Sequence, residues 1–272
     1  MARNRRRKDR GDKAKGIVFM LLGFILIAGL AGGGYWLSQK RVKLDAVSGC
    51  PVTGPTAIHA ILIDRSDPIS PQQAQQVRLV IDGYISRAKI GERFDLYVAS
   101  GDTVSVLTPV ASVCSPGRGD QANELYENPQ MIQRQFEAKF VGVMKENLSR
   151  LLETATADSS PILESIKAAA VSSFGSIEPG QIPLQMTIVS DLVQHSQVSS
   201  HFRGETSFDD LARRSAWRSL QANLKGATVN VLYLLRPVSV RNGQPIQNRG
   251  HQVFWEKALS ASGAGDVKFT SL

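Results

Sequence analysis

The sequence is poor in cysteine, in aromatic residues and, beyond its first fifteen positions, in excess charge of either sign. Two cysteines in 272 residues exclude a disulfide-dense scaffold and a zinc site built from four thiolates. With 42% hydrophobic and 21% charged residues, the chain is neither mainly disordered nor a protein of many membrane spans. Eight Lys or Arg and two Asp stand in residues 1–15, so most of the net charge of +8 belongs to a tail. The folded part is therefore not predicted to bind nucleic acid.

One stretch, residues 16–37 (GIVFMLLGFILIAGLAGGGYWL), has no charge at all. A helix of this length reaches roughly 33 Å, enough to cross the hydrocarbon core of a bilayer. A cleaved signal peptide is the rival interpretation, but its apolar region is about 7–15 residues long and AGLAGGG is a poor cleavage site. A retained single-pass anchor in the lipid bilayer is favoured.

The charges on the two sides of this stretch predict its orientation. Eight basic residues precede it and three follow it, at Lys40, Arg41 and Lys43. We therefore expect the N-terminus in the cytoplasm and everything after residue 40 outside it. The short basic tail favours the bacterial inner membrane, with the C-terminal part in the periplasm.

Cys50 and Cys114 are expected to lie in this exported part. An oxidising compartment favours one disulfide between them, whereas the alternative is two unpaired small hydrophobic residues.

The rest of the chain alternates buried strands and helices. A turn-rich linker over 38–56 precedes a single domain over 57–272. We expect buried strands at 57–64, 183–191 and 227–237, a hairpin with strands at 94–100 and 104–110, and a last strand at 266–272. Helices are expected from Pro71, over 129–153, from Ser160–Pro161, over 209–226 and in VFWEKALSASG. This order predicts a doubly wound, mostly parallel α/β sheet with one antiparallel edge strand.

Acidic residues follow two of the buried strands. In open α/β sheets, ligands bind beyond the carboxyl ends of the strands, where the strand order reverses. If the strands ending at Asp64 and before Asp191 are neighbours, the two carboxylates emerge about 5 Å apart. Hydroxyls from Ser66, Ser70, Ser159 and Ser160 would complete an oxygen-only set, which suits a hard divalent ion, Mg²⁺ first, with Mn²⁺ and Ca²⁺ as alternatives.

These features resemble the von Willebrand factor A (integrin I-like) domain, abbreviated vWA. The resemblance covers about 215 residues and is carried by the strand ending in D-x-S, the following helix, the hairpin FDLYVASGDTVSVLTPV and the later IVSD. Family members hold a metal ion with D-x-S-x-S, a Thr from another loop and a later Asp. By position, the resemblance implies that Asp64, Ser66, Ser160 (or, as an alternative, Ser159) and Asp191 hold the metal.

The sequence departs from the family motif in three places. Pro68 stands where the second Ser should be, Ser70 comes two residues too late, and Leu192 follows Asp191 where many members have Gly. The alternative interpretation is purely structural: Asp64 and Ser66 cap the helix that begins at Pro71, and Asp191 organises its own loop through side-chain bonds to the backbone.

Arginines follow the same strands. The loop 236–250 holds Arg236, Arg241 and Arg249 and no acidic residue, and Arg203 lies in the loop after Asp191. Such a basic rim favours a partner that presents an acidic group; the alternative is a set of solvated arginines.

Together these features predict a membrane-anchored envelope protein whose vWA-like domain binds a protein partner, with or without a divalent cation, and has no enzymatic turnover. One alternative is a structural component of a membrane-spanning assembly, such as a secretion or conjugation machine, with a degenerate metal site. Another is a metal-dependent hydrolase, for which His195 is the one candidate base.

Overall fold

The structure is a computed structural model that describes residues 3–39, 43–45, 48–99, 106–123, 127–153, 157–236, 240–241 and 244–272. The chain divides into two units, Met1–Lys43 and Leu44–Leu272. The predicted linker over 38–56 is thus split. Its second half belongs to the C-terminal unit, where Leu44 forms a β-bridge with Pro51.

The N-terminal unit contains one long helix, α1 (Arg3–Gln39). Within it, Gly16–Trp36 has a mean hydropathy of 2.3, and none of its most apolar part is buried against the protein. By length and composition this segment is able to cross a membrane.

The C-terminal unit is built on a six-stranded sheet with the order β3-β2-β1-β4-β5-β8. The strands are β1 (Ala57–Asp64), β2 (Glu92–Ala99), β3 (Ala111–Cys114), β4 (Leu184–Ser190), β5 (Thr228–Tyr233) and β8 (Asp266–Ser271). Every neighbouring pair is parallel except β2 and β3. The predicted fold class, a mostly parallel α/β sheet with one antiparallel edge strand, is confirmed.

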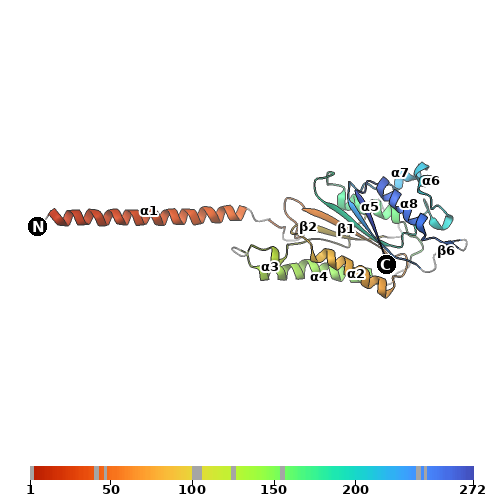
Figure 1. Ribbon diagram of the computed structural model, residues 1–272, viewed down its shortest axis with the longest axis horizontal. Helices are drawn as coiled ribbons and strands as arrows, with labels where there is room; N and C mark the ends of the chain where they lie inside the picture. The colour runs from red at the N-terminus through yellow and green to blue at the C-terminus, as the bar shows by residue number, and fades with distance from the viewer. Residues whose placement is uncertain are drawn as a thin grey trace. The chain divides into compact units, whose positions relative to one another are not determined.

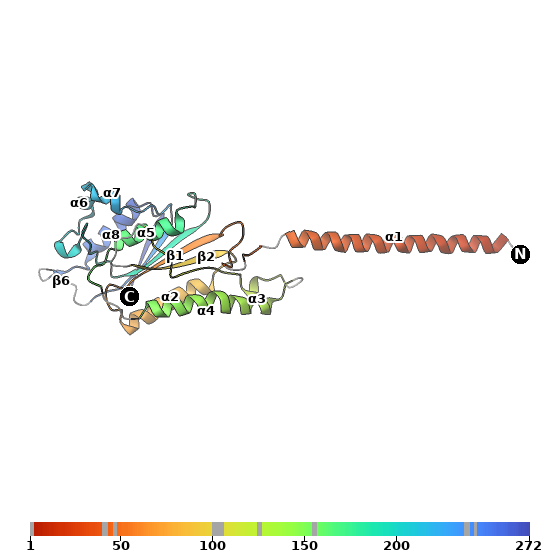
Figure 2. The same ribbon diagram turned by 180° about the vertical axis from the view of Figure 1, so that it is seen from behind.

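Helices cover both faces of this sheet. They are α2 (Pro71–Ser86), α3 (Pro129–Gln135), α4 (Gly142–Leu151), α5 (Ile162–Phe174), α6 (Phe208–Arg213), α7 (Ala216–Leu220) and α8 (Arg249–Ala261). Figures 1 and 2 show α2, α3 and α4 on one side and α5 to α8 on the other.

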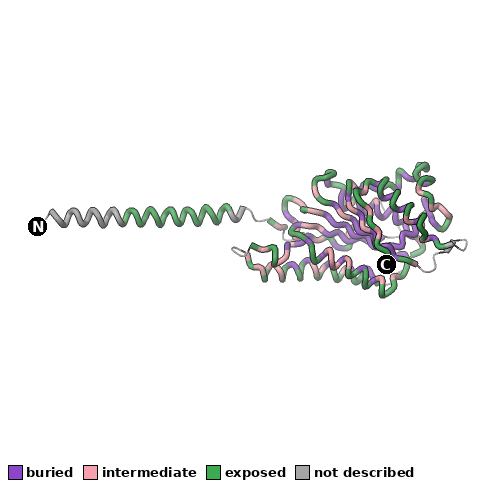
Figure 3. The backbone as a smooth tube through the Cα atoms, viewed as in Figure 1, coloured by how far each residue is buried: buried purple, intermediate pink, exposed green. Residues whose placement is uncertain are grey.

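Two hydrophobic clusters follow from this layering. Alternate residues of β1 point to opposite faces, so Leu62 packs with α5 and α8 while Ile61 packs with α2 and α4. Seven of the eight β1 residues are buried, as expected for a central parallel strand, and Figure 3 shows the buried sheet between the partly exposed helices.

The first crossover helix begins as the sequence predicts, but with a different cap. Pro71 opens α2, and Ser70 is the N-cap, with Gln73 completing a capping box. Asp64 and Ser66 therefore do not cap this helix.

Three predicted elements differ from the structure. The hairpin partner of β2 is β3 at 111–114 rather than 104–110; residues 104–105 lie outside the described residues, and 106–110 form no strand. The helix predicted over 209–226 is two short helices, because Arg214 adopts an extended conformation at the end of α6. The helix predicted over 129–153 forms, with a π-helical segment at Phe136–Val141 between α3 and α4.

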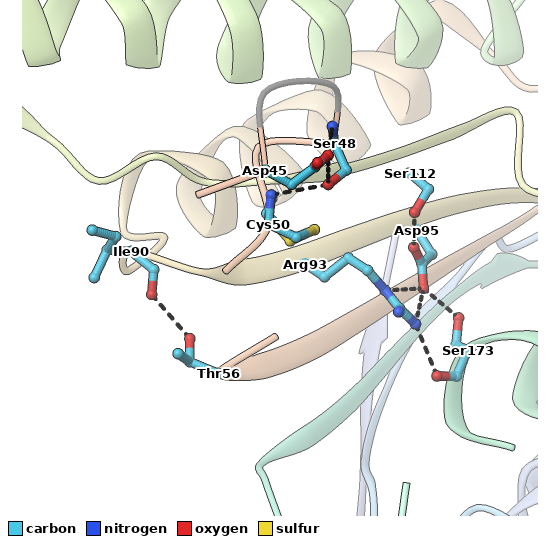
Figure 4. The surroundings of a disulfide bond; sticks show 10 residues. Asp45, Ser48, Cys50, Thr56, Ile90, Arg93, Asp95, Ser112 and Ser173 are labelled. Atoms are coloured by element: carbon cyan, nitrogen blue, oxygen red, sulfur yellow. Dashed lines mark hydrogen bonds and ion pairs between the residues drawn. A yellow bond between two sulfur atoms is a disulfide. The ribbon is translucent and has the colours of Figure 1, made fainter. Parts of the chain in front are cut away.

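The predicted disulfide between Cys50 and Cys114 is present. It joins the segment before β1 to the end of β3, the antiparallel edge strand, and the backbone N–H of Cys114 also reaches Ser48 O at 3.4 Å. Figure 4 shows the disulfide with the Asp45 and Ser48 hydrogen bonds around Cys50. The start of the C-terminal unit is thus fastened to one edge of the sheet.

One small ribbon and two short 3₁₀ turns are the remaining regular elements of the described residues. A two-stranded ribbon, β6 (Val240–Arg241) and β7 (Gln244–Pro245), lies between β5 and α8. Short 3₁₀ turns occur at Gly119–Gln121 and His201–Arg203.

Candidate functional site

The candidate site lies where the strand order reverses. β1 is at the centre of the sheet, and the chain proceeds outward from it in one direction through β2 and in the other through β4 and β5. The carboxyl ends of β1 and β4 therefore flank the position at which doubly wound folds bind ligands. The register pairs Ile63 with Val189, so the residues that follow these two positions share one edge of the sheet.

Asp64, the last residue of β1, is buried among hydrogen-bond donors. Its Oδ1 accepts the backbone N–H of Ser66 at 2.9 Å. Its Oδ2 accepts the hydroxyls of Ser190 at 2.7 Å and Ser160 at 3.3 Å. Ser66 also donates its hydroxyl to Ser160 at 3.1 Å. The structure thus brings together three of the predicted metal ligands, Asp64, Ser66 and Ser160.

Asp191, the fourth predicted ligand, follows β4 and is 1% exposed. Its Oδ1 accepts the backbone N–H of Val193 at 2.9 Å, and its Oδ2 accepts Nε of Arg236 at 3.1 Å. Burial, and after it the nearby negative charge of Asp64, raise the pKa of Asp191 to about 6, against the opposing effects of the Val193 N–H and the Arg236 guanidinium. The electrostatic interaction between the two aspartates agrees with their placement at one edge of the sheet.

The bond of Asp191 to the backbone N–H two residues ahead is the one that the structural alternative predicts. Asp64 makes a similar bond to Ser66 rather than capping α2, as that alternative expected. Both are Asx-type bonds, in which a carboxylate organises the turn after its own strand. Such a bond occupies one oxygen of each carboxylate and leaves the other oxygen to side chains. The hydrogen bonds of both carboxylates to the backbone therefore give them a structural role at this edge.

The predicted partner-binding arginines differ in their surroundings. Arg236 is drawn into the site, where its Nη1 donates to the carbonyl of Pro68. Arg203 pairs with Glu205 at 3.2 Å and donates to loop carbonyls. Arg249 is the first residue of α8 and is exposed. Arg241 belongs to β6, but its side chain lies outside the described residues.

The sequence interpretation missed two residues that hold the site together. Ser190 is the last residue of β4; its hydroxyl bonds Asp64 and accepts the backbone N–H of Leu192 at 2.7 Å. Gln247 donates to the carbonyls of Asp191 and Leu234, both at 2.9 Å, and accepts the backbone N–H of Arg236 at 2.7 Å. The position of Ser190, next to Asp191 in the strand, is a sequence signal that could have found it. Gln247 lies 56 residues from Asp191, and nothing in the sequence around it indicates that it contacts the site.

Leu192 has a left-handed backbone conformation of the kind that favours glycine. Its φ is +59°, in the left-handed region that strains an L residue through its Cβ, and the residue is fully buried. Its carbonyl accepts Nε1 of Trp255 at 2.9 Å and lies 3.0 Å from Nε2 of His251. These contacts from α8 hold the turn after Asp191 in its strained form.

The donor set does not fit a divalent ion well. Each of the four carboxylate oxygens accepts a protein hydrogen bond, and one of these bonds comes from a guanidinium. Pro68 supplies no hydroxyl, and the hydroxyl of Ser70 is used as the cap of α2. Within the described part of the chain, no three His, Cys, Asp or Glu residues are grouped to hold a metal. Binding of Mg²⁺ by Asp64, Ser66, Ser160 and Asp191 stays a prediction.

Comparisons with known proteins add little to this description. No family model matches the chain, and no curated protein matches it. Among solved structures, it is similar to an aerotolerance-related membrane protein from Bacteroides fragilis carrying multiple mutations to serine. That similarity has 14% identity and a TM-score of 0.38, and it covers 79% of this chain and 91% of the other. A similarity at this level carries no functional argument, so the fold class rests on the sheet itself.

Proposed function

We propose that this chain is a membrane-anchored, vWA-like interaction protein that binds an acidic group of a protein partner at the carboxyl ends of β1 and β4. The observation that carries this proposal is the meeting of Asp64, Asp191 and Arg236 at the strand-order switch point. Open α/β sheets bind ligands at this position. In this proposal Asp64, Ser66, Ser160 and Asp191 line the site, and the arginines Arg203, Arg236, Arg241 and Arg249 select the partner.

In this proposal α1 is the anchor of a bacterial inner-membrane protein. The basic tail stays in the cytoplasm and the C-terminal unit lies in the periplasm. The Cys50–Cys114 disulfide supports this orientation because disulfides persist in oxidising compartments.

We propose that the site has no catalytic turnover. A hydrolase would need a base aimed at the site. His195, the candidate, places its Nδ1 2.8 Å from the hydroxyl of Ser200, within its own loop. Its link to the site is the backbone bridge with Ser160.

Cross-linking in intact cells followed by mass spectrometry tests the interaction. The wild type and the variants Arg218→Gln and Arg236→Gln are expressed at equal levels. The wild type and Arg218→Gln should give the same specific cross-linked partner, and Arg236→Gln should give none. Arg218 is an exposed arginine of α7, so its variant removes the same charge outside the site. Equal cross-linking by all three proteins would contradict the proposed site and favour the structural-component alternative.

A second experiment tests the orientation. Reporter enzymes that are active only in the periplasm or only in the cytoplasm are fused after Leu272. We expect activity of the periplasmic reporter, whereas activity of the cytoplasmic reporter alone would refute the exported location.

A further inference from the structure

We propose that the guanidinium of Arg236 is the resident cation of this site, in the role that a divalent ion has in the vWA family. The inference rests on the site of the proposed function and deepens it, because the site then recognises acidic groups without metal. Three features of the site support it.

The first feature is the position of the guanidinium. Arg236 Nε bonds Asp191 Oδ2 at 3.1 Å, and Nη1 bonds the carbonyl of Pro68 in the loop between β1 and α2. The guanidinium therefore bridges the segments after β4 and after β1, which are the two segments that a bound cation would join. Pro68 stands where the family motif has its second serine, and its carbonyl meets the arginine instead.

The second feature is that the backbone on both sides of this ion pair is held in place. Gln247 accepts the N–H of Arg236 and donates to the carbonyl of Asp191, so one side chain sets the separation of the two residues. The backbone N–H of Leu235 bonds the carbonyl of Leu272 at 3.1 Å, and the carbonyl of Leu235 accepts Nε2 of Gln73 at 3.0 Å. Arg236 is therefore pre-positioned rather than free to swing from the surface.

The third feature is the balance of charge and of hydrogen bonds. Asp191 is 1% exposed, and its ion pair with Arg236 compensates its negative charge. Asp64 receives three donors, from Ser66, Ser160 and Ser190. A divalent ion would have to displace several of these donors and would be repelled by the guanidinium.

The same arrangement leaves a route for a ligand. The side chain of Arg236 is 16% exposed, and its two bonds within the described residues use Nε and Nη1. A planar guanidinium binds carboxylates through parallel hydrogen bonds. An aspartate or glutamate of the partner is thus the ligand class that this site fits.

The test measures metal binding and side-chain coupling on the full chain in detergent micelles, with no partner present. After treatment with EDTA, millimolar Mn²⁺ or Mg²⁺ should leave the Tm of the C-terminal unit unchanged. Arg236→Gln should lower the Tm by about 6 °C or more, because it leaves the buried Asp191 carboxylate without its cation. The double variant Asp191→Asn with Arg236→Gln should lose much less than the sum of the two single losses.

Two results would overturn the proposal. One is a Mn²⁺-dependent rise in Tm of the wild type that Asp191→Asn abolishes, because it would place a metal ion at the site. The other is a loss of Tm in the double variant that equals the sum of the two single losses, because Arg236 would then not stabilise the Asp191 carboxylate. If Arg236→Gln does not fold, the Mn²⁺ titrations of wild type and Asp191→Asn still decide. Since no partner is involved, failure of this inference is separate from failure of the proposed interaction.

Discussion

The hydroxyl of Ser190 donates to Oδ2 of Asp64 at 2.7 Å, although the two residues are 126 positions apart in the chain. This bond joins the end of β4 to the end of β1. The hydroxyl oxygen of Ser190 also accepts the backbone N–H of Leu192 at 2.7 Å. Ser190 therefore orients the Asp64 carboxylate and holds the strained turn after Asp191.

The substitution Ser190→Ala should destabilise the C-terminal unit. It leaves the buried N–H of Leu192 without its acceptor and removes one donor from Asp64. We expect the free energy of unfolding, measured by chemical denaturation, to fall by about 1–3 kcal/mol. Ser219→Ala is the matched control, because the hydroxyl of Ser219 is exposed and bonds the carbonyl of Ala216 in its own helix; it should change stability by less than about 0.5 kcal/mol. Equal effects of the two substitutions would contradict the assigned role.

The raised pKa of Asp191 predicts one component of the pH dependence of stability. In the folded state the carboxyl keeps its proton up to about pH 6, whereas its ordinary pKa is 3.8. The folded state binds more protons between these values, so this group's contribution to stability is complete below pH 3.8 and is lost as pH rises through 6. Denaturation of wild type and Asp191→Asn across this range should differ in slope, with stability falling more steeply with pH in the wild type. If the unfolding free energies of the two proteins change with pH in parallel, the raised pKa of Asp191 is refuted.

The buried histidines predict a component of opposite sign. Burial lowers the pKa of His59 to about 3 and that of His251 to about 4, below the ordinary value of 6.5. The unfolded state binds these protons first, so the contribution is present above pH 6.5. It is lost as pH falls from 6.5 through about 4 for His251 and through about 3 for His59. The slope of the unfolding free energy against pH measures how many more protons the unfolded state binds than the folded state. His251→Gln should reduce this number by up to about one between pH 4 and 6.5. His59→Gln provides an independent repeat, and a slope unchanged in both variants would rule out this source of acid sensitivity.

The Cys50–Cys114 disulfide predicts a dependence on reductant. The two cysteines are 64 positions apart, and in the chain-entropy model opening a loop of this length costs about 4 kcal/mol. The double variant Cys50→Ser with Cys114→Ser should unfold at a lower denaturant concentration than the oxidised wild type, with no further effect of reductant. Tryptophan fluorescence of the buried Trp217 and Trp255 reports this transition. An unchanged midpoint would show that the native hydrogen bonds around Cys50 suffice.

Much of the fold could be predicted from the sequence because its signals are local. The nearly continuous apolar runs that form β1 and β4 are typical of strands buried on both faces, and Pro71 marks the start of α2. The predicted bounds were wrong where contacts between distant parts of the chain, rather than the local residue pattern, decide the secondary structure. Residues 104–110 alternate like a strand, yet β2 pairs with 111–114, and the helical pattern over 209–226 is interrupted at Arg214.

The sequence by itself determined the apolar N-terminal helix, the alternation of strands and helices, and the acidic and hydroxyl residues at the strand ends, because each depends on residues close together in the chain. Only the tertiary structure decided which strands are neighbours, and with that the meeting of Asp64 with Ser160 and Ser190. It also decided that Arg236, predicted as part of a basic rim for an acidic partner, pairs with the buried Asp191 45 residues away. The physical reason is that burial makes an unpaired carboxylate costly, and the group that compensates it is selected by distance in space rather than by spacing in the chain.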